Sequence, residues 1–142
     1  MATLTVTISE SLTLNGSDRG SSNTTEITGV TQAESRIVKV GTTEQSLILF
    51  DSAEGAGQFA DSTVDYLRIT NLNSTNFVTL RMTSGDDEYF VKLAPSDSYI
   101  LFETVMDVDD DSGAAVASLT NIDSIKAKAD TAACNVEVFV AA

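Results

Sequence analysis

Apolar and polar residues alternate along much of this sequence, which is the pattern of β-strands that bury one face. Near the N-terminus, Leu4, Val6 and Ile8 fall on one face, while threonines and a serine occupy the other. The alternation returns in Arg36–Val40, and in Val136–Val140 it places three valines on one face. These segments predict half-buried strands towards both ends of the chain.

Four further strand-like segments follow one another in the middle of the chain, separated by residues typical of turns. They are Tyr66–Thr70, Phe77–Met82, Tyr89–Leu93 and Tyr99–Phe102. In the second of them, Val78, Leu80 and Met82 are expected to face inward. The connections 71–76 and 84–87 are interpreted as hairpin turns. We therefore predict an antiparallel meander for this region.

The remaining segments complete a β pattern. Leu47–Phe50 is a short continuous apolar run, typical of a strand covered on both faces, and Ile125–Ala129 alternates again. Residues 15–23 are expected to form a turn followed by a loop, and residues 51–62 a flexible loop. Ala114–Leu119 is too short for an independent helix and is expected to form at most one turn.

Short strands at regular spacing, without alternating helices, are typical of a β-sandwich or barrel. With roughly nine to ten such strands, we predict an all-β fold, either an antiparallel β-sandwich or a jelly roll, with at most one short helix. The length of 142 residues fits a single domain over residues 1–142.

The charge balance and the absence of histidine narrow the function. Twenty-one acidic side chains face eight basic ones, which gives a net charge of −13. Such a field repels phosphate backbones and anionic membranes, so neither a nucleic acid nor a membrane is expected as a partner. The missing histidine removes the commonest general base and metal ligand near neutral pH. We expect a protein that binds or assembles, and not an enzyme.

The lone cysteine and the N-terminal residues bear on where the protein is made. Cys134 cannot form an internal disulfide and is expected to be a small buried hydrophobe. The first residues lack both the basic and the apolar region of a signal peptide. No apolar run is long enough to cross a bilayer. These features predict synthesis in the cytoplasm.

Alternating carboxylates in one acidic segment are the best candidates for metal binding. Asp107, Asp109 and Asp111 could converge on Ca²⁺ as in the start of an EF-hand loop. The pattern then departs from that loop, because the glycine comes one place late and the twelfth position is Ser118. A solvated acidic loop without a cofactor is favoured over a calcium site. Asp86–Glu88 is a second acidic cluster, which with these aspartates would supply the acids of a carboxylate-dependent hydrolase.

Three side chains are candidates for an interface. If Val78 and Leu80 point inward, Phe77 and Arg81 lie on the opposite, outer face of their strand. Phe139 lies opposite the valines of the last strand in the same way. Aromatic and arginine side chains on an outer face are typical anchors of protein contacts.

The central segments carry a resemblance to a known family. Val64–Asn71, Phe77–Arg81 and Tyr89–Ser98, with their asparagine turn and Lys-Leu-x-Pro step, resemble small β-rich virion proteins of tailed bacteriophages. The resemblance implies a non-enzymatic capsid decoration or cement protein that binds between major capsid subunits. It also implies a homotrimer on the outer capsid surface, made in the host cytoplasm. A tail, collar or fibre component and a calcium-dependent carbohydrate-binding module remain the alternatives.

Overall fold

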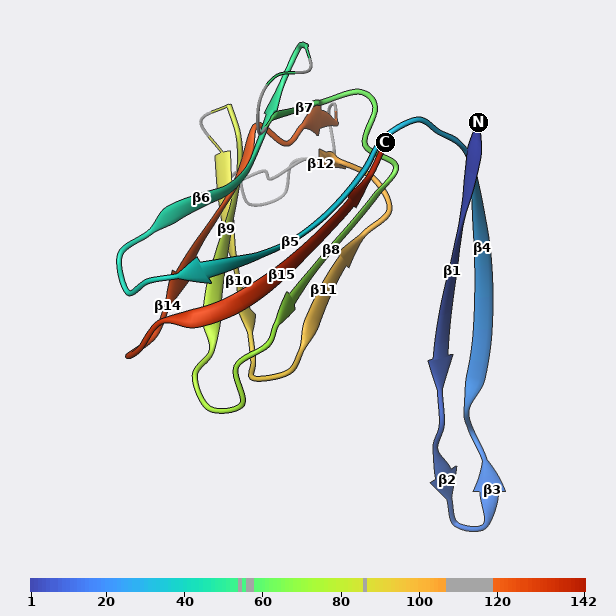
Figure 1. Cartoon of the computed structure of the whole chain (residues 1–142). Helices are drawn as coiled ribbons and strands as arrows, with labels where there is room; N and C mark the ends of the chain where they lie inside the picture. Colours follow the sequence, from blue (N-terminus) through green and yellow to red (C-terminus); the bar gives the residue numbers. More distant parts are fainter. Residues whose placement is uncertain (54, 56–57, 86, 107–118) are drawn as a thin grey trace, which may run out of the picture. The chain divides into compact units, whose positions relative to one another are not determined.

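The computed structural model describes residues 1–53, 55, 58–85, 87–106 and 119–142 and divides the chain into two compact units, residues 1–32 and residues 33–142. Figure 1 shows the elements of both units. In the described part, no helix is long and apolar enough to cross a membrane. Of the helical turn expected over Ala114–Leu119, residues 114–118 lie outside the described residues, and Leu119 is in no helix.

The first unit is a two-stranded antiparallel ribbon. β1 (Ala2–Glu10) pairs with β4 (Ser21–Val30), and beyond them β2 (Thr13–Leu14) pairs with β3 (Ser17–Asp18). Asn15 and Gly16 connect β2 to β3 with φ angles of 51° and 77°, which is the positive-φ pair of a tight hairpin turn. The expected turn is confirmed.

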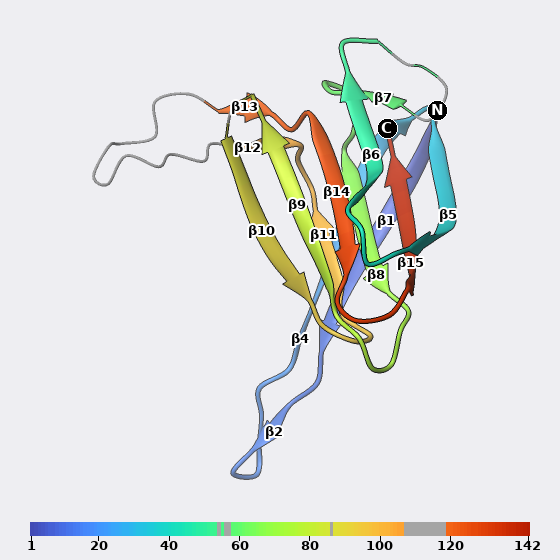
Figure 2. The ribbon, with the colours of Figure 1, turned by 90° about the vertical axis from the view of Figure 1, so that its left-hand side faces the viewer.

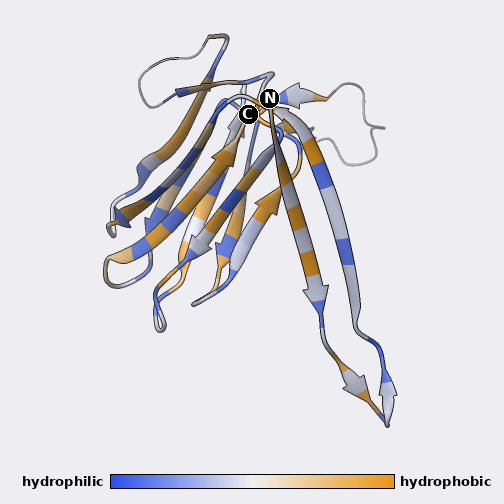
Figure 3. Cartoon of the chain, turned by 45° about the vertical axis from the view of Figure 1, so that its right-hand side comes forward, coloured by the Kyte–Doolittle hydropathy of each residue, from blue (hydrophilic) through white to orange (hydrophobic). Residues whose placement is uncertain are grey.

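The loop expected to continue through Asn23 is wrong, because this residue pairs with Ile8 inside the ribbon. Serine, threonine and asparagine suit loops by themselves, but here a neighbouring strand supplies the hydrogen bonds that make them a strand. The apolar side of the ribbon is visible as repeated orange bands along β1 in Figure 3. Leu4 and Val6 on that side are half-buried, while Ile8 is 38% exposed.

The second unit is built from two facing antiparallel sheets with one added parallel strand (Figures 1 and 2). The four-stranded sheet has the order β11 (Ser98–Leu101), β8 (Tyr66–Asn71), β15 (Cys134–Ala141), β5 (Ala33–Val40). The five-stranded sheet has the order β10 (Asp87–Leu93), β9 (Val78–Ser84), β14 (Ser124–Ala129), β6 (Gln45–Asp51), β7 (Gln58–Ala60). A small pair, β12 (Val105–Met106) and β13 (Thr120–Asn121), lies apart from both sheets in the pairing order. The predicted all-β fold of the sandwich or jelly-roll type is confirmed.

The core lies between the two sheets. β9 contributes Val78, Leu80 and Met82, which are fully buried as predicted. β15 contributes its three valines from the opposite sheet, each at most 1% exposed. Cys134 is also fully buried in this cluster, as expected, and burial raises the pKa of its thiol. All residues of the core cluster belong to the second unit, and the single domain over 1–142 stays a prediction.

The predicted meander is wrong in its topology. β8 lies in the four-stranded sheet, β9 and β10 form a hairpin in the other sheet, and β11 returns to pair with β8. Only the predicted hairpin at 84–87 is therefore present, because residues 72–77 and 94–97 cross between the sheets. Period-two alternation shows which side chains point inward, but it does not show which of two facing sheets a strand joins.

The flexible loop expected over 51–62 is interrupted by β7, which pairs in parallel with β6. Phe59 and Ala60 are 5% and 7% exposed, so this short strand belongs to the buried structure. The strand was not predicted because its short apolar segment is flanked by glycines and acidic residues in the sequence. Pairing with a neighbouring strand stabilises it.

One buried side chain, that of Asn71, joins both connections that cross between the sheets. Asn71 is fully buried, and its Nδ2 donates to the carbonyls of Asn76, Leu93 and Ala94 at 2.9, 3.3 and 3.2 Å. Its Oδ1 accepts from the backbone N–H of Asn73 at 3.0 Å. A single amide therefore satisfies backbone groups from both crossings, which apolar packing could not do.

A pair of tyrosines closes one open side of the sandwich. Tyr89 of β10 and Tyr99 of β11 belong to different sheets, and their hydroxyl oxygens lie 2.8 Å apart. Burial, followed by the hydrogen bond to Tyr99, raises the pKa of Tyr89. At another strand pair, the Arg36 guanidinium of β5 donates to the Leu47 carbonyl of β6. Polar contacts thus link the two sheets in addition to the apolar core.

Removing the Tyr89 hydroxyl tests the contribution of the Tyr89–Tyr99 hydrogen bond to stability. Tyr89→Phe is expected to lower the free energy of unfolding by about 1 kcal/mol, because the Tyr99 hydroxyl loses its half-buried hydrogen-bond partner. Tyr99→Phe should cost a similar amount, and the double variant should cost less than the sum of the two. Urea unfolding of the four proteins measures this cycle, and strictly additive losses would show that the two hydroxyls do not interact.

Candidate interaction face

The outer face of the five-stranded sheet carries basic and aromatic side chains on β10, β9 and β14, the strands that run side by side in Figure 2. Residues that alternate with the buried core positions of β9, β10 and β14 point to this side. We call this surface the interaction face and define it by six side chains: Phe77, Arg81, Phe90, Lys92, Lys126 and Lys128. It includes two of the three interface candidates predicted from the sequence.

Strand register places these residues in two neighbouring rows. One row across the sheet is Phe90, Arg81 and Lys126. The next row, again from β10 through β9 to β14, is Lys92, Thr79 and Lys128. Neighbouring strands lie about 4.8 Å apart, and residues two apart on a strand are separated by about 7 Å. The four cationic positions therefore fit within an area of about 10 by 7 Å at the level of the backbone.

Two carboxylates hold Arg81 in place. Its Nε donates to Glu88 at 2.6 Å, and its Nη1 donates to Glu44 at 3.0 Å. Its guanidinium carbon lies 5.9 Å from the centre of the Phe90 ring. The hydrogen bond to Glu88, followed by that to Glu44, raises the pKa of Arg81. The guanidinium is thus oriented before any partner binds.

The two aromatic rings differ in exposure. Phe77 is half-buried, and the Lys92 ammonium lies 4.5 Å from its ring centre. Phe90 is 58% exposed, which makes it the main apolar group that the interaction face presents to solvent. An exposed aromatic ring flanked by cations can supply both apolar area and charge to a protein contact.

No family model matches this sequence, and neither does any curated protein. Function must therefore be inferred from the side chains themselves.

Phe139, the third predicted interface residue, lies elsewhere. It is on the outer side of the four-stranded sheet, where it meets Tyr66 edge to face with ring centres 6.0 Å apart. Tyr66 also contacts Phe102, at 5.4 Å. The structure therefore brings Phe77 and Arg81 to one face and leaves Phe139 in a separate aromatic group. Whether any of the three contacts a partner stays a prediction.

Sequence reasoning missed four members of this face: Phe90, Lys92, Lys126 and Lys128. The signal was present in part, since alternation with Ala127 and Ala129 already places the two lysines of β14 outward. The sequence pattern did not predict the strand register that places β14 beside β9.

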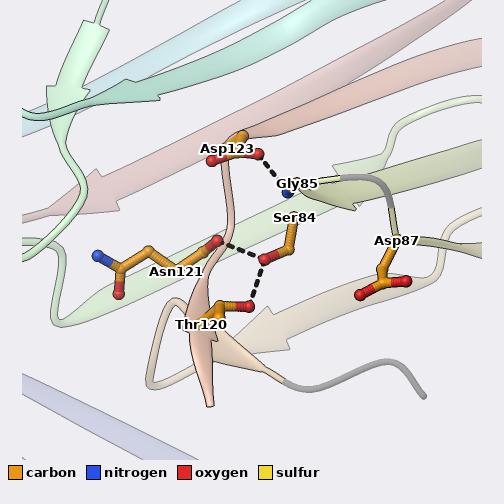
Figure 4. A pocket seen from close by; sticks show the side chains of 6 residues that line it. All are labelled: Ser84, Gly85, Asp87, Thr120, Asn121 and Asp123. Atoms are coloured by element: carbon orange, nitrogen blue, oxygen red, sulfur yellow. Dashed lines mark hydrogen bonds between the residues drawn. The ribbon is translucent and has the colours of Figure 1, made fainter. Parts of the chain in front are cut away.

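A polar hollow of about 430 Å³ lies at the β9–β10 turn, and its lining is drawn in Figure 4: Ser84, Gly85, Asp87, Thr120, Asn121 and Asp123. The Ser84 hydroxyl lies 2.6 Å from the Thr120 hydroxyl and donates to the Asn121 carbonyl at 2.8 Å. Asp123 accepts from the Gly85 N–H at 2.6 Å. These bonds fasten the end of the sandwich.

Of the acidic candidates, only Asp87 and Glu88 lie among the described residues. Among the described residues, no group of three or more acidic or cysteine side chains could hold a metal ion. Asp107, Asp109 and Asp111 lie outside the described residues, as does Asp86. Glu88 of the second acidic cluster instead pairs with Arg81 on the interaction face.

Proposed function

We propose that this protein is a non-enzymatic virion structural protein, most specifically a capsid decoration or cement protein. In this function it binds between major capsid subunits on the outer capsid surface and stabilises the mature shell. The observation that carries the proposal is the interaction face, which holds four of the eight basic residues of a chain with net charge −13.

Charge explains why such a face favours assembly. A strongly acidic protein stays soluble at high concentration but is repelled by other acidic surfaces. A local group of cations orients the molecule, so that this face meets the partner first. Phe90 then adds the apolar contact area that electrostatic steering alone does not provide. Docking through one face of a rigid sheet requires no chemical step.

Stabilisation of the shell follows from mass action. Each bound copy adds interface area that is lost when capsid subunits separate, so binding to the intact shell raises its stability. The partners in this proposal are the major capsid protein and further copies of this chain, as a homotrimer. The resemblance of the central segments to virion proteins of tailed bacteriophages supports the same assignment.

Adding the purified protein to stripped, mature capsids of the source virion tests the function. We expect saturable co-sedimentation and a higher melting temperature of the decorated capsid. Cryo-electron microscopy of the product places the bound protein on the head or on the tail. A protein that does not sediment with capsids at any ionic strength would contradict the proposal.

The same assay tests Phe90 as the apolar anchor. Phe90→Ser is expected to weaken capsid binding by about tenfold or more, because a central exposed aromatic ring loses its contact area. Leu72→Ser is the matched control, since Leu72 is 48% exposed but lies outside the interaction face. Both substitutions should change folding stability by less than about 0.5 kcal/mol. Equal binding by the two variants would remove Phe90 from the contact.

A further inference from the structure

The cations of the interaction face are neighbours on adjacent strands of the sheet. Lys126 of β14 lies directly opposite Arg81 of β9, and Lys128 and Lys92 are on the two sides of Thr79. Like charges directly opposite each other on neighbouring strands destabilise a sheet. In a chain with 21 acidic and only eight basic residues, opposite charges were abundantly available for these positions.

The carboxylates on this face do not neutralise it. Glu44 and Glu88 both pair with Arg81. Across the described ranges, Lys92, Lys126 and Lys128 form no ion pair, and Lys92 lies over the Phe77 ring. Four cations and two carboxylates leave a local charge of +2, so the rest of the chain carries −15 to reach the total of −13. Lys128 is exposed and Lys126 half-buried, so these charges are open to a partner.

We propose that the interaction face binds an acidic protein surface on the capsid subunit, with Lys126 and Lys128 as the contacting charges. This inference rests on the proposed function and names the partner chemistry of the same site. The positive patch is complementary to a compact group of carboxylates of similar size. A bound carboxylate beside Lys126 and Lys128 supplies the opposite charge that these two lysines lack, as Glu44 and Glu88 do for Arg81.

An acidic protein surface fits better than a nucleic acid. A duplex is an extended polyanion that reaches beyond a patch of about 10 Å and meets the surrounding acidic surface of this protein. The Debye length at physiological salt is about 8 Å, so the patch acts on a partner only at close range. A short range favours a local cluster of carboxylates, with Phe90 beside it to exclude water.

The arrangement separates stability from binding. Lys126 forms no ion pair and Arg81 is already paired with Glu44 and Glu88, so Lys126→Glu is expected to change the melting temperature little. The same substitution removes a contacting charge and adds a repulsive one, so capsid binding should weaken. A lysine with a purely structural role would give the reverse, with a lower melting temperature and unchanged binding.

Charge reversal on the full chain tests the inference. The variants are Lys126→Glu, Lys128→Glu and their combination, and the control is Lys39→Glu on the outer side of the four-stranded sheet. Each single variant changes the net charge equally. At about 0.15 M salt the double variant is expected to bind stripped capsids at least about tenfold more weakly than wild type, with Lys39→Glu within about twofold. Circular dichroism melting confirms that each variant is folded, and Lys126→Gln with Lys128→Gln repeats the test without added acid.

The possible results lead to different conclusions. If wild type binds capsids and the double variant binds as tightly as Lys39→Glu, the acidic-surface inference is overturned while the proposed function stands. If a short DNA duplex displaces the protein from capsids at equal concentration, the partner is phosphate and not an acidic protein surface, which also overturns the inference. If wild type binds no capsid at any salt concentration, the proposed function fails and the capsid partner inferred here fails with it.

Discussion

Asn71→Asp is expected to lower the free energy of unfolding by about 3 to 5 kcal/mol, although the two side chains have nearly the same shape. The amide of Asn71 is fully buried and donates to three carbonyl oxygens from both connections between the sheets. A carboxylate at this place has no proton to donate, and its oxygen would face those carbonyls. The loss therefore combines unpaired acceptors with a buried charge.

The pH dependence of Asn71→Asp has a definite sign. Burial and the facing carbonyls disfavour the charged carboxylate, so its pKa in the folded state is raised above the unfolded value of about 3.9. Below about pH 3.9 both states are protonated, and the charge makes no contribution. As the pH rises towards the folded-state pKa, the unfolded state releases its proton first and the deficit relative to wild type grows. Urea unfolding of both proteins at several pH values from about 4 to about 8 measures this difference in the free energy of unfolding.

Asn135→Asp is the matched control for Asn71→Asp. Asn135 is exposed on β15, so the same chemical change should alter stability by less than about 0.5 kcal/mol. If Asn71→Asp stays within about 1 kcal/mol of wild type, the amide does not hold the two connections together as described.

Ile69→Ala is expected to cost about 3 kcal/mol, because it leaves a cavity in the centre of the sandwich. Ile69 is fully buried on β8, with Val138 of β15 and Tyr99 of β11 as its cross-strand neighbours. Urea denaturation measures this loss. An unchanged slope of the unfolding free energy against urea concentration would show that the substitution destabilises the native state and does not alter the unfolded ensemble.

Ile37→Ala makes the same deletion at an exposed site. Ile37 lies on β5 of the same sheet and is 64% exposed, so its truncation should cost less than about 0.5 kcal/mol. Similar losses at the two positions would contradict the placement of the core. A large loss at Ile37 alone would show that a further copy or unit covers the outer side of β5.

Local patterns in the sequence were sufficient to predict the fold class and the inward side chains. Val78, Leu80 and Met82 were identified as core because a strand turns alternate residues to opposite faces, whatever it pairs with. The turn at Asn15 and Gly16 was equally predictable, since these residue types tolerate the positive φ that a tight hairpin needs. The outward positions of Phe77 and Arg81 followed from the same alternation. All of these features depend on neighbours within a few residues.

Tertiary structure alone decided how the strands combine. The crossing of β8, β9 and β11 between two sheets depends on pairings between residues far apart in the chain, which alternation leaves open. The same long-range register sets Lys126 opposite Arg81 and separates Phe139 from them. The sequence by itself determined which side chains point outward, but only strand pairing determined which outward side chains become neighbours. The interaction face is therefore a product of register, because hydrogen bonding between distant strands places its cations side by side.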